Sequence, residues 1–366
     1  MVIFGGDRLG VQKRDKSLSM TCNLPNTRRS LFASLVLFFF LGQQAATSSP
    51  VFEVFVGSCL RQSVDNSIMQ TIAAQDPDML LMLGDNVYGD DEDAKLTKLA
   101  AAYEMAKANV NWSAFRGVQA IWDDHDFGRN DGGSDYPHKA AAKDLFLSFF
   151  NVPADDPRRQ RAGLYTEFTR QIGAVSVQFI LLDTRSFRAP LKKAGWLERS
   201  RYRRYAPDNS REKTMLGEAQ WKWLAGALAQ PADVRVVASS IQILARDHGF
   251  EKWHNFPRER TRLLDMIGAR AGGAVVLLSG DRHFSAFYHD AEADEGRGLV
   301  EMTSSSLNIP WLDADEQDAL QTGPLYAKTG SFGVLRIEPE ARKVRLQIRD
   351  GANNTVSEKT VAIPKD

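Results

Sequence analysis

Residues 274–287, AVVLLSGDRHFSAF, are the stretch on which the expected fold depends. The first part is an apolar run rich in Val and Leu between two glycines, which is typical of a buried strand in an α/β sheet. The run ends at Gly280, so Asp281, Arg282 and His283 follow at the carboxyl end of the strand. Ligands of open α/β sheets bind outside these ends, and an Asp and a His two residues apart can face one ion there. By itself, this short motif is equally compatible with a structural turn.

Two earlier apolar runs also end in side chains that bind metals. The run at residues 51–56 is followed by Cys59. The run at residues 79–83 continues into GDNVY, which contains Asp85 and Tyr88. Because ligand sites form outside the carboxyl ends of neighbouring strands, we expect these side chains to lie near the first motif.

A third apolar run, residues 118–122, leads into a dense group of charges. The group is Asp123, Asp124, His125 and Asp126. Adjacent carboxylates repel one another in a neutral core, and bound cations or paired donors relieve the repulsion. A run of charges is usually a solvated face, but this one follows an apolar strand directly, which favours a functional site.

The side chains at these strand ends form a set with many oxygen donors and few nitrogens. Such a set suits hard cations held close together. The chain has neither a Gly-rich nucleotide fingerprint nor a Gly-Xaa-Ser-Xaa-Gly nucleophile elbow. Metal-assisted hydrolysis is therefore the expected class of reaction. The candidate residues at this site are Cys59, Asp85, Tyr88, Asp124, His125, Asn130, Asp281 and His283.

The remaining patterns predict an α/β protein in which strands and helices alternate. Helices are expected at residues 217–229 and 257–267, and two strands within residues 164–182. Residues 332–348 predict a C-terminal antiparallel hairpin. Residues 188–210 are irregular and basic, and we expect them to overhang the site.

The composition limits the classes of partner. The chain has 366 residues with 46 basic and 46 acidic side chains, so its formal net charge is zero. This balance gives no electrostatic basis for a nucleic-acid-binding or membrane-surface protein, and no apolar run is long enough to cross a bilayer. The length allows a large core in one domain or two. The oligomeric state is left open.

Residues 1–46 have the pattern of an export signal. Arg28 and Arg29 precede the apolar residues 31–41, and small and polar residues follow, as in a twin-arginine signal. An ordinary secretory signal or a membrane anchor is the alternative. Residues 1–19 are mostly polar and precede the signal, so a start of translation after them is a second possibility.

Removal of this signal leaves Cys59 as the sole cysteine, because Cys22 lies within the signal. No intramolecular disulfide can then form. A lone thiol in an oxidising compartment is either buried as a small hydrophobic group or bound to a metal. Ligation is the hypothesis that its position after a strand favours.

Together these motifs resemble the alkaline phosphatase D (PhoD-like) family of calcineurin-like metallophosphoesterases. The resemblance is carried by VGSC at residues 56–59, LGDNVY at 83–88, WDDHD at 122–126 and SGDRH at 279–283. It covers one domain, residues 51–366. It implies a four-layer α/β/β/α sandwich, hydrolysis of phosphate monoesters or diesters, and export to the periplasm or the exterior, which the twin-arginine pattern fits.

The resemblance also implies ligand roles. Asp85 would bridge two metals, since a carboxylate has two oxygens to share. Cys59 and Tyr88 would bind the harder metal, which is Fe³⁺ in the better-known members. The residues that would complete the sites, with Ca²⁺ or another divalent ion as the companion, are Asn130, Asp281 and His283.

Two departures from the wider superfamily leave one ligand undecided. The first motif there usually supplies Asp and His, whereas this chain has Gly57 and Cys59. The third motif is usually Gly-Asn-His-Asp, and DDHD stands in its place. Either Asp124 or Asn130 would therefore bind the metal.

Four further residues are candidates for catalysis. His125 would protonate the leaving group or orient the phosphate, and Asp126 would hold it. A cation near the leaving phosphate is also needed, for which Arg185 and Arg282 are the candidates. The alternatives are a phospholipase- or nuclease-type phosphodiesterase with the same metals, and a calcium-binding protein without turnover, which has no use for an imidazole at the site.

The twin-arginine pattern makes a direct prediction. Replacing Arg28 and Arg29 by lysine should block export, because the paired arginines are the signal that the export machinery reads. Cell fractionation measures this, and sequencing of the exported protein should find a mature N-terminus near Ala46. Unchanged export of the double-lysine variant would leave only an ordinary signal or an anchor.

Overall fold

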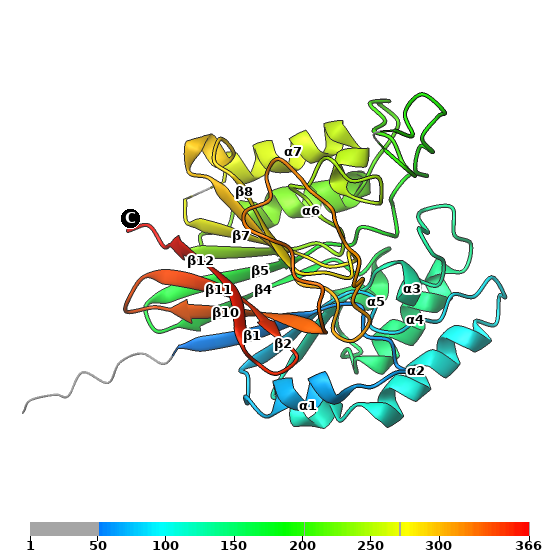
Figure 1. Ribbon diagram of the computed structural model, residues 1–366, viewed down its shortest axis with the longest axis horizontal. Helices are drawn as coiled ribbons and strands as arrows, with labels where there is room; N and C mark the ends of the chain where they lie inside the picture. The colour runs from blue at the N-terminus through cyan, green and yellow to red at the C-terminus, as the bar shows by residue number, and fades with distance from the viewer. Residues whose placement is uncertain (1–50, 201, 271, 366) are drawn as a thin grey trace, which may run out of the picture. The chain divides into compact units, whose positions relative to one another are not determined.

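Two six-stranded β-sheets form the centre of the protein (Figure 1). The structure is a computed structural model that describes residues 51–200, 202–270 and 272–365. These residues belong to one unit, Ser48–Asp366. The predicted export signal, residues 1–46, lies outside the described residues, and none of the described helices has the length and apolarity to cross a lipid bilayer.

The first sheet joins the beginning of the described chain to its end. Its strand order is β12-β11-β10-β1-β2-β3. The parallel strands are β1 (Phe52–Gly57), β2 (Met79–Leu83) and β3 (Val118–Ile121). The antiparallel strands are β10 (Ser331–Glu338), β11 (Lys343–Asp350) and β12 (Thr355–Ala362). The predicted C-terminal hairpin is thus confirmed as β10–β11, and β10 also pairs antiparallel with β1.

The second sheet has the strand order β4-β5-β6-β7-β9-β8. Its parallel strands are β5 (Val175–Leu181), β6 (Val234–Ala238), β7 (Ala274–Ser279) and β9 (Leu299–Thr303). The antiparallel edge strands are β4 (Thr166–Ile172) and β8 (Ala286–Asp290). The sequence did not predict β8, because it is an edge strand that is specified by pairing with β9 later in the chain.

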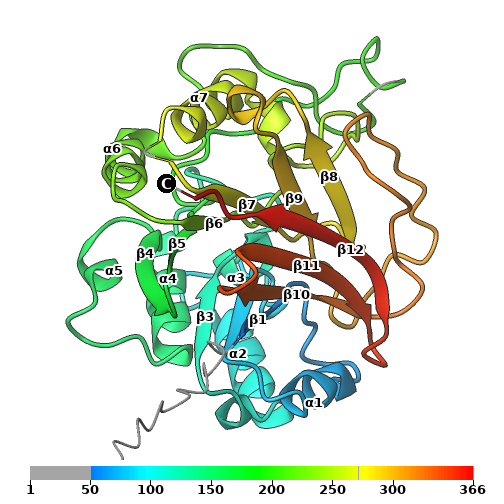
Figure 2. The same cartoon turned by 90° about the vertical axis from the view of Figure 1, so that its left-hand side faces the viewer.

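Helices cover the outer face of each sheet (Figure 2). Against the first sheet lie α1 (Ser67–Ala73), α2 (Thr97–Asn109) and α4 (Lys139–Phe149). Against the second sheet lie α6 (Gly217–Leu228) and α7 (Pro257–Gly268). The short helices are η1 (Trp112–Ala114), α3 (Asp124–Phe127), α5 (Pro157–Gln160), η2 (Trp253–Asn255) and η3 (Asp294–Gly296).

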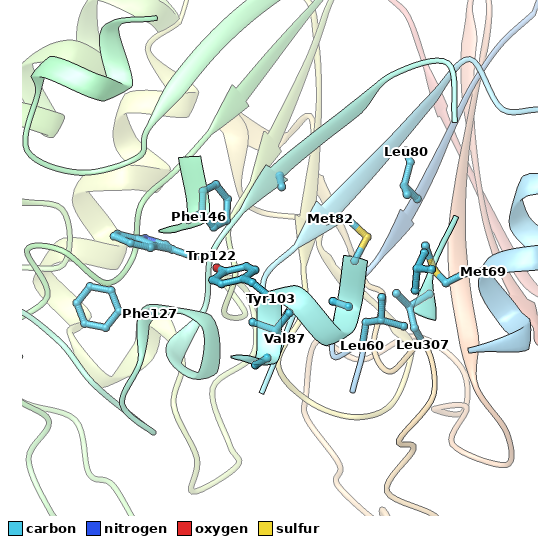
Figure 3. Close-up of a cluster of buried hydrophobic side chains, with 14 of the residues drawn as sticks. Leu60, Met69, Leu80, Met82, Val87, Tyr103, Trp122, Phe127, Phe146 and Leu307 are labelled. Carbon is cyan, nitrogen blue, oxygen red and sulfur yellow. The ribbon is translucent and has the colours of Figure 1, made fainter. Parts of the chain in front are cut away.

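Three apolar cores separate the four layers. Between the sheets, alternate residues of facing strands such as Leu81 and Phe179 are fully buried, as the period of two in a strand requires. Beneath the helices of the first sheet, Met82 of β2 and Tyr103 of α2 belong to one buried cluster (Figure 3). Under the helices of the second sheet, Trp221 of α6 is buried. The predicted α/β/β/α sandwich is therefore confirmed.

The carboxyl ends of strands from both sheets meet at one place. The backbone N–H of Leu307, after β9, donates to the carbonyl of Ser58, after β1, at 2.9 Å. The Ser304 hydroxyl donates to the carbonyl of Val56 at 2.8 Å. At Gly280 a Cβ atom would lie 2.6 Å from Oγ of Ser58, so only glycine allows the end of β7 to come this close to the end of β1. This junction carries the candidate site.

Candidate metal centre

Four site residues that follow strands have left-handed backbone conformations. Their φ angles are 56° at Cys59, 50° at Asp85, 66° at Asp281 and 56° at His283. Residues other than glycine rarely adopt this region, and they do so where the surrounding structure holds them there, often at functional sites. The turns therefore direct these side chains toward the junction at a cost in backbone energy that the rest of the fold offsets.

One group of ligand atoms brings together residues from both sheets. Atoms of Cys59, Asp85 and His283 all lie within 4.8 Å of one another. The Tyr88 hydroxyl donates to Oδ2 of Asp85 at 3.3 Å and lies 3.2 Å from Nε2 of His283. The Ser305 hydroxyl donates to Sγ of Cys59 at 3.1 Å. The structure thus places Cys59, Asp85, Tyr88 and His283 around one position.

A second group surrounds Asp124, at the start of α3. Ligand atoms of Asp85, Asp124 and His125 lie within 4.8 Å of one another, as do those of Asp123, Asp124 and Asp281. Because Asp85 belongs to this group and to the first one, its carboxylate links the two groups.

The structure distinguishes the two candidates that the sequence left open. Asp124 is buried, its Oδ2 accepts from the backbone N–H of Asp131 at 2.6 Å, and its Oδ1 has no hydrogen-bond partner among the described residues. A buried carboxylate oxygen without a donor is costly unless a cation approaches it. Asn130 is exposed, and its amide donates to Asp131 at 2.8 Å. The geometry therefore favours Asp124 as the ligand and places Asn130 on the rim.

Burial gives the anionic residues perturbed acidities. It raises the pKa of the Cys59 thiol to about 12 and that of Asp281 to about 6. The pKa of Asp85 is also raised well above its usual value, first by burial and then by the neighbouring Asp124. Anionic donors held together away from water favour their neutral forms. A bound cation reverses this preference, because thiolates and carboxylates are the forms that bind metals.

His283 is prepared as a neutral ligand. Its Nδ1 lies 2.8 Å from the carbonyl oxygen of Ile309. A carbonyl only accepts, so Nδ1 carries the proton and the lone pair is on Nε2, beside Tyr88 and Asp85. Burial lowers the pKa of His283, which also keeps the ring neutral. The donor set, the unpartnered oxygen of Asp124 and this tautomer all fit bound metal ions.

The predicted partner of His125 is wrong. His125 Nδ1 lies 2.6 Å from Oδ2 of Asp90. Asp126 instead accepts hydrogen bonds from the backbone N–H groups of Asp85 at 3.3 Å, Asn86 at 3.2 Å and Asp123 at 2.6 Å. Asp126 therefore holds the turn after β2 against the start of α3, and Asp90 orients the imidazole.

The charge of His125 depends on Asp85 and Asp124, two of the candidate metal ligands. Burial alone lowers the pKa of His125, but Asp124 and Asp85 outweigh it and raise the pKa to about 11. The ring also lies against that of Tyr88, with centroids 4.3 Å apart. His125 is therefore held as a cation beside the Asp85 and Asp124 carboxylates.

The two predicted arginines have different surroundings. Arg185 is fully buried, and its guanidinium donates to Asp123 and to Glu251, each at 2.6 Å. It does not line the cavity at the site, so the prediction that it contacts a phosphate is corrected: it neutralises carboxylates beneath the centre. Arg282 lines that cavity, paired with Glu316 and lying 4.4 Å from the Phe250 ring centroid.

A cavity of about 310 Å³ opens over the candidate ligands. Arg204 reaches it from the basic segment 188–210, as expected, and pairs with Asp131 at 2.5 Å. Sequence reasoning missed Asp131, Glu251 and Arg204 because no local motif marks them. The lining residues are Asp85, Asp124, His125, Asn130, Asp131, Arg204, Phe250, Glu251, Asp281, Arg282, His283 and Trp311.

Comparison with known proteins identifies the class. The sequence model of the family described as PhoD-like phosphatase matches residues 52–348. The chain therefore belongs to the PhoD-like phosphatase family, whose members act on phosphate esters. No curated protein matches the chain significantly.

Two solved structures share the fold. A structure titled "Structure of PhoD" aligns with a TM-score of 0.64 and 17% identity, over 86% of this chain and 69% of that chain. A Plasmodium protein, titled "GAP50 the anchor in the inner membrane complex of Plasmodium", aligns with a TM-score of 0.55 and 11% identity. The alignment covers 86% of this chain and 90% of that chain. At these identities the likeness concerns the fold alone.

Two variants test whether Asp90, and not Asp126, is the residue that orients His125. Asp90→Asn should lower kcat for a phosphate ester by roughly 10- to 100-fold, because the residue that orients the imidazole loses its charge. Metal content and melting temperature should not change. Asp126→Asn should lower the melting temperature and the metal content, because it loosens the turn that carries Asp85. A normal kcat for Asp90→Asn, with a purely kinetic defect in Asp126→Asn, would restore the original assignment.

Proposed function

We propose that this chain is an exported, metal-dependent phosphatase that hydrolyses phosphate mono- or diesters. The observation that carries the proposal is Asp85, whose carboxylate belongs to two ligand groups at the junction of both sheets. Structural ion pairs do not need a carboxylate shared in this way, beside an open cavity whose lining includes further carboxylates, two histidines and two arginines. The family membership supports hydrolysis of phosphate esters.

We propose that the centre holds two metal ions, on either side of Asp85. Cys59, Tyr88, Asp85 and His283 would hold the harder ion, for which we propose Fe³⁺, since thiolate and phenolate are anionic donors. Asp85, Asp124 and Asp281 would hold the companion ion, for which we propose Ca²⁺, since oxygen donors suit it. When bound, such ions activate a water for attack and neutralise the phosphoryl oxygens.

The side chains supply orientation and a proton. His125 is fixed by Asp90 through Nδ1, which leaves its Nε2 to protonate the oxygen of the leaving group. Arg282 and Arg204 line the cavity and provide positive charge for the phosphate. Arg185, below the cavity, offsets the charge of Asp123 and Glu251 so that the acidic centre can form at all.

Export remains part of the proposal. It rests on Arg28, Arg29 and the apolar residues 31–41, and it would place the enzyme in the periplasm or outside the cell. A ferric thiolate–phenolate site is compatible with such an oxidising compartment.

The activity itself is tested by assaying p-nitrophenyl phosphate against its bis-ester, each with and without a chelator. Hydrolysis that the chelator abolishes and added metal restores supports a metal-dependent phosphatase, and the ratio of the two rates assigns monoester or diester preference. Absence of turnover in protein that retains its metals would favour a calcium-binding protein without catalysis.

Substitution of the shared carboxylate is the most sensitive variant. Asp85→Asn should lower hydrolysis by at least about 100-fold, because a neutral amide weakens both metal sites at once. Metal content and far-ultraviolet circular dichroism should be measured beside the rate, and the fold should persist. Asn130→Asp, on the rim, is the matched control and should change the rate by less than about tenfold. Two retained metals and a near-normal rate in Asp85→Asn would contradict the assignment.

The iron proposal predicts a visible colour. A phenolate bound to ferric iron absorbs visible light, so protein made with iron available should be coloured. Tyr88→Phe should remove or shift the band, and Cys59→Ala should weaken iron retention. A colourless, iron-free protein that is fully active with divalent ions alone would show that Tyr88 only packs against its neighbours.

A further inference from the structure

A basic loop, residues 192–200 and 202–205, stands beside the cavity. Its base is fixed: the Ala194 N–H donates to the carbonyl of Arg204 at 3.0 Å, and the Tyr205 N–H donates to that of Gly249 at 2.8 Å. The Tyr205 hydroxyl donates to Asp131, on the cavity wall, at 2.7 Å. A Cβ atom at Gly249 would lie 2.8 Å from the backbone nitrogen of Arg203. The base of the loop is therefore attached closely to the site.

The tip of the basic loop exposes two large apolar side chains. Trp196 is 82% exposed and Leu197 is 70% exposed, more than any other large hydrophobic residue that the structure describes. The tip is an ordered turn, because Glu198 accepts from the Gly195 N–H at 2.9 Å and pairs with Lys192 at 3.0 Å. The exposed pair is thus presented outward by a built turn, with the only acidic side chain of the loop neutralised.

Cationic side chains flank this apolar tip along the loop. A second cavity of about 310 Å³ is lined by Lys193, Arg199, Arg203 and Arg204, together with Ala194 and Tyr205. Arg204 pairs with Asp131. Among the described residues, the side chains of Lys193, Arg199 and Arg203 have no ion-pair partner. The zero net charge of the whole chain therefore conceals a local excess of positive charge.

We propose that the basic loop docks the protein onto an anionic phospholipid surface. Trp is enriched at membrane–water interfaces, where its ring lies at the level of the headgroups. Lys and Arg near such a surface are attracted to anionic lipids. An apolar tip with basic flanks combines both contributions. A soluble polyanion would bind the cationic side chains but would leave Trp196 and Leu197 exposed to water. A bilayer would contact both, so the two features together favour a bilayer.

The geometry also limits which side of the cavity meets the membrane. On another segment bordering the cavity, Leu312 is 68% exposed and follows Trp311, a lining residue. Its neighbours Asp313 and Asp315 are exposed and acidic, which disfavours an anionic surface. Docking therefore uses the basic loop, and because Arg204 belongs to both cavities, it brings the candidate metal centre close to the lipid headgroups.

Vesicle co-sedimentation tests this proposal independently of the phosphatase activity. The mature chain should bind vesicles of equal parts phosphatidylglycerol and phosphatidylcholine, and bind pure phosphatidylcholine at least tenfold more weakly. Trp196→Ala with Leu197→Ala should reduce binding to the anionic vesicles at least tenfold, and so should Lys193→Glu with Arg203→Glu. All proteins compared begin at the predicted mature N-terminus near Ala46, so differences in binding come from the substitutions.

Leu312→Ala is the matched control, because it removes an equally exposed leucine from an acidic neighbourhood. It should bind anionic vesicles like the unmodified chain. Hydrolysis of soluble bis-p-nitrophenyl phosphate should be unchanged in the loop variants, which shows that the centre is intact. An equal loss in Leu312→Ala would indicate general apolar adhesion. Loss in the charge variant alone would indicate a site for soluble anions. Either result would overturn the proposal.

Discussion

The structure depends on the convergence of buried acidic side chains at the junction of its two sheets. Cys59, Asp85, Asp124 and Asp281 converge there, and all but Asp281 are almost inaccessible to solvent. Removing a carboxylate from water costs several kcal/mol unless a cation or donors compensate. Arg185 provides one cation, but it is committed to Asp123 and Glu251. His125 lies beside Asp85 and Asp124, and the unpartnered oxygen of Asp124 fits a bound cation, which links the fold to the proposed chemistry.

Much of this arrangement could be predicted from the sequence because it is local. A buried strand followed by a turn with Asp or His places that side chain at the carboxyl end, and Asp85 and Asp281 were placed in this way. Three of the strands that carry the motifs, β1, β2 and β3, are adjacent in the first sheet, and the fourth, β7, lies in the second sheet packed against it, so separate motifs converge. The hairpin of β10 and β11 was likewise predictable, because its alternation of apolar residues and its turn are local.

The interactions that were not predicted are side-chain hydrogen bonds and ion pairs. They join residues far apart in the chain, or residues for which several partners were available. Asp126 is next to His125 in the chain, but the helical turn of α3 directs it to the backbone of residues 85 and 86. Asp90, 35 residues away, takes the imidazole instead. Arg185 and Glu251 lie 66 positions apart and meet only because the fold buries both. No spacing rule in a single sequence identifies such pairs.

Anomalous X-ray diffraction from crystals of the purified protein is the most direct measurement of the central claim. The account predicts two metal peaks, each about 2.0–2.6 Å from a different carboxylate oxygen of Asp85. One peak should also lie beside Cys59 and His283, and the other beside Asp124. Catalytically active crystals with no peak at Asp85, or with a single ion elsewhere in the cavity, would contradict it.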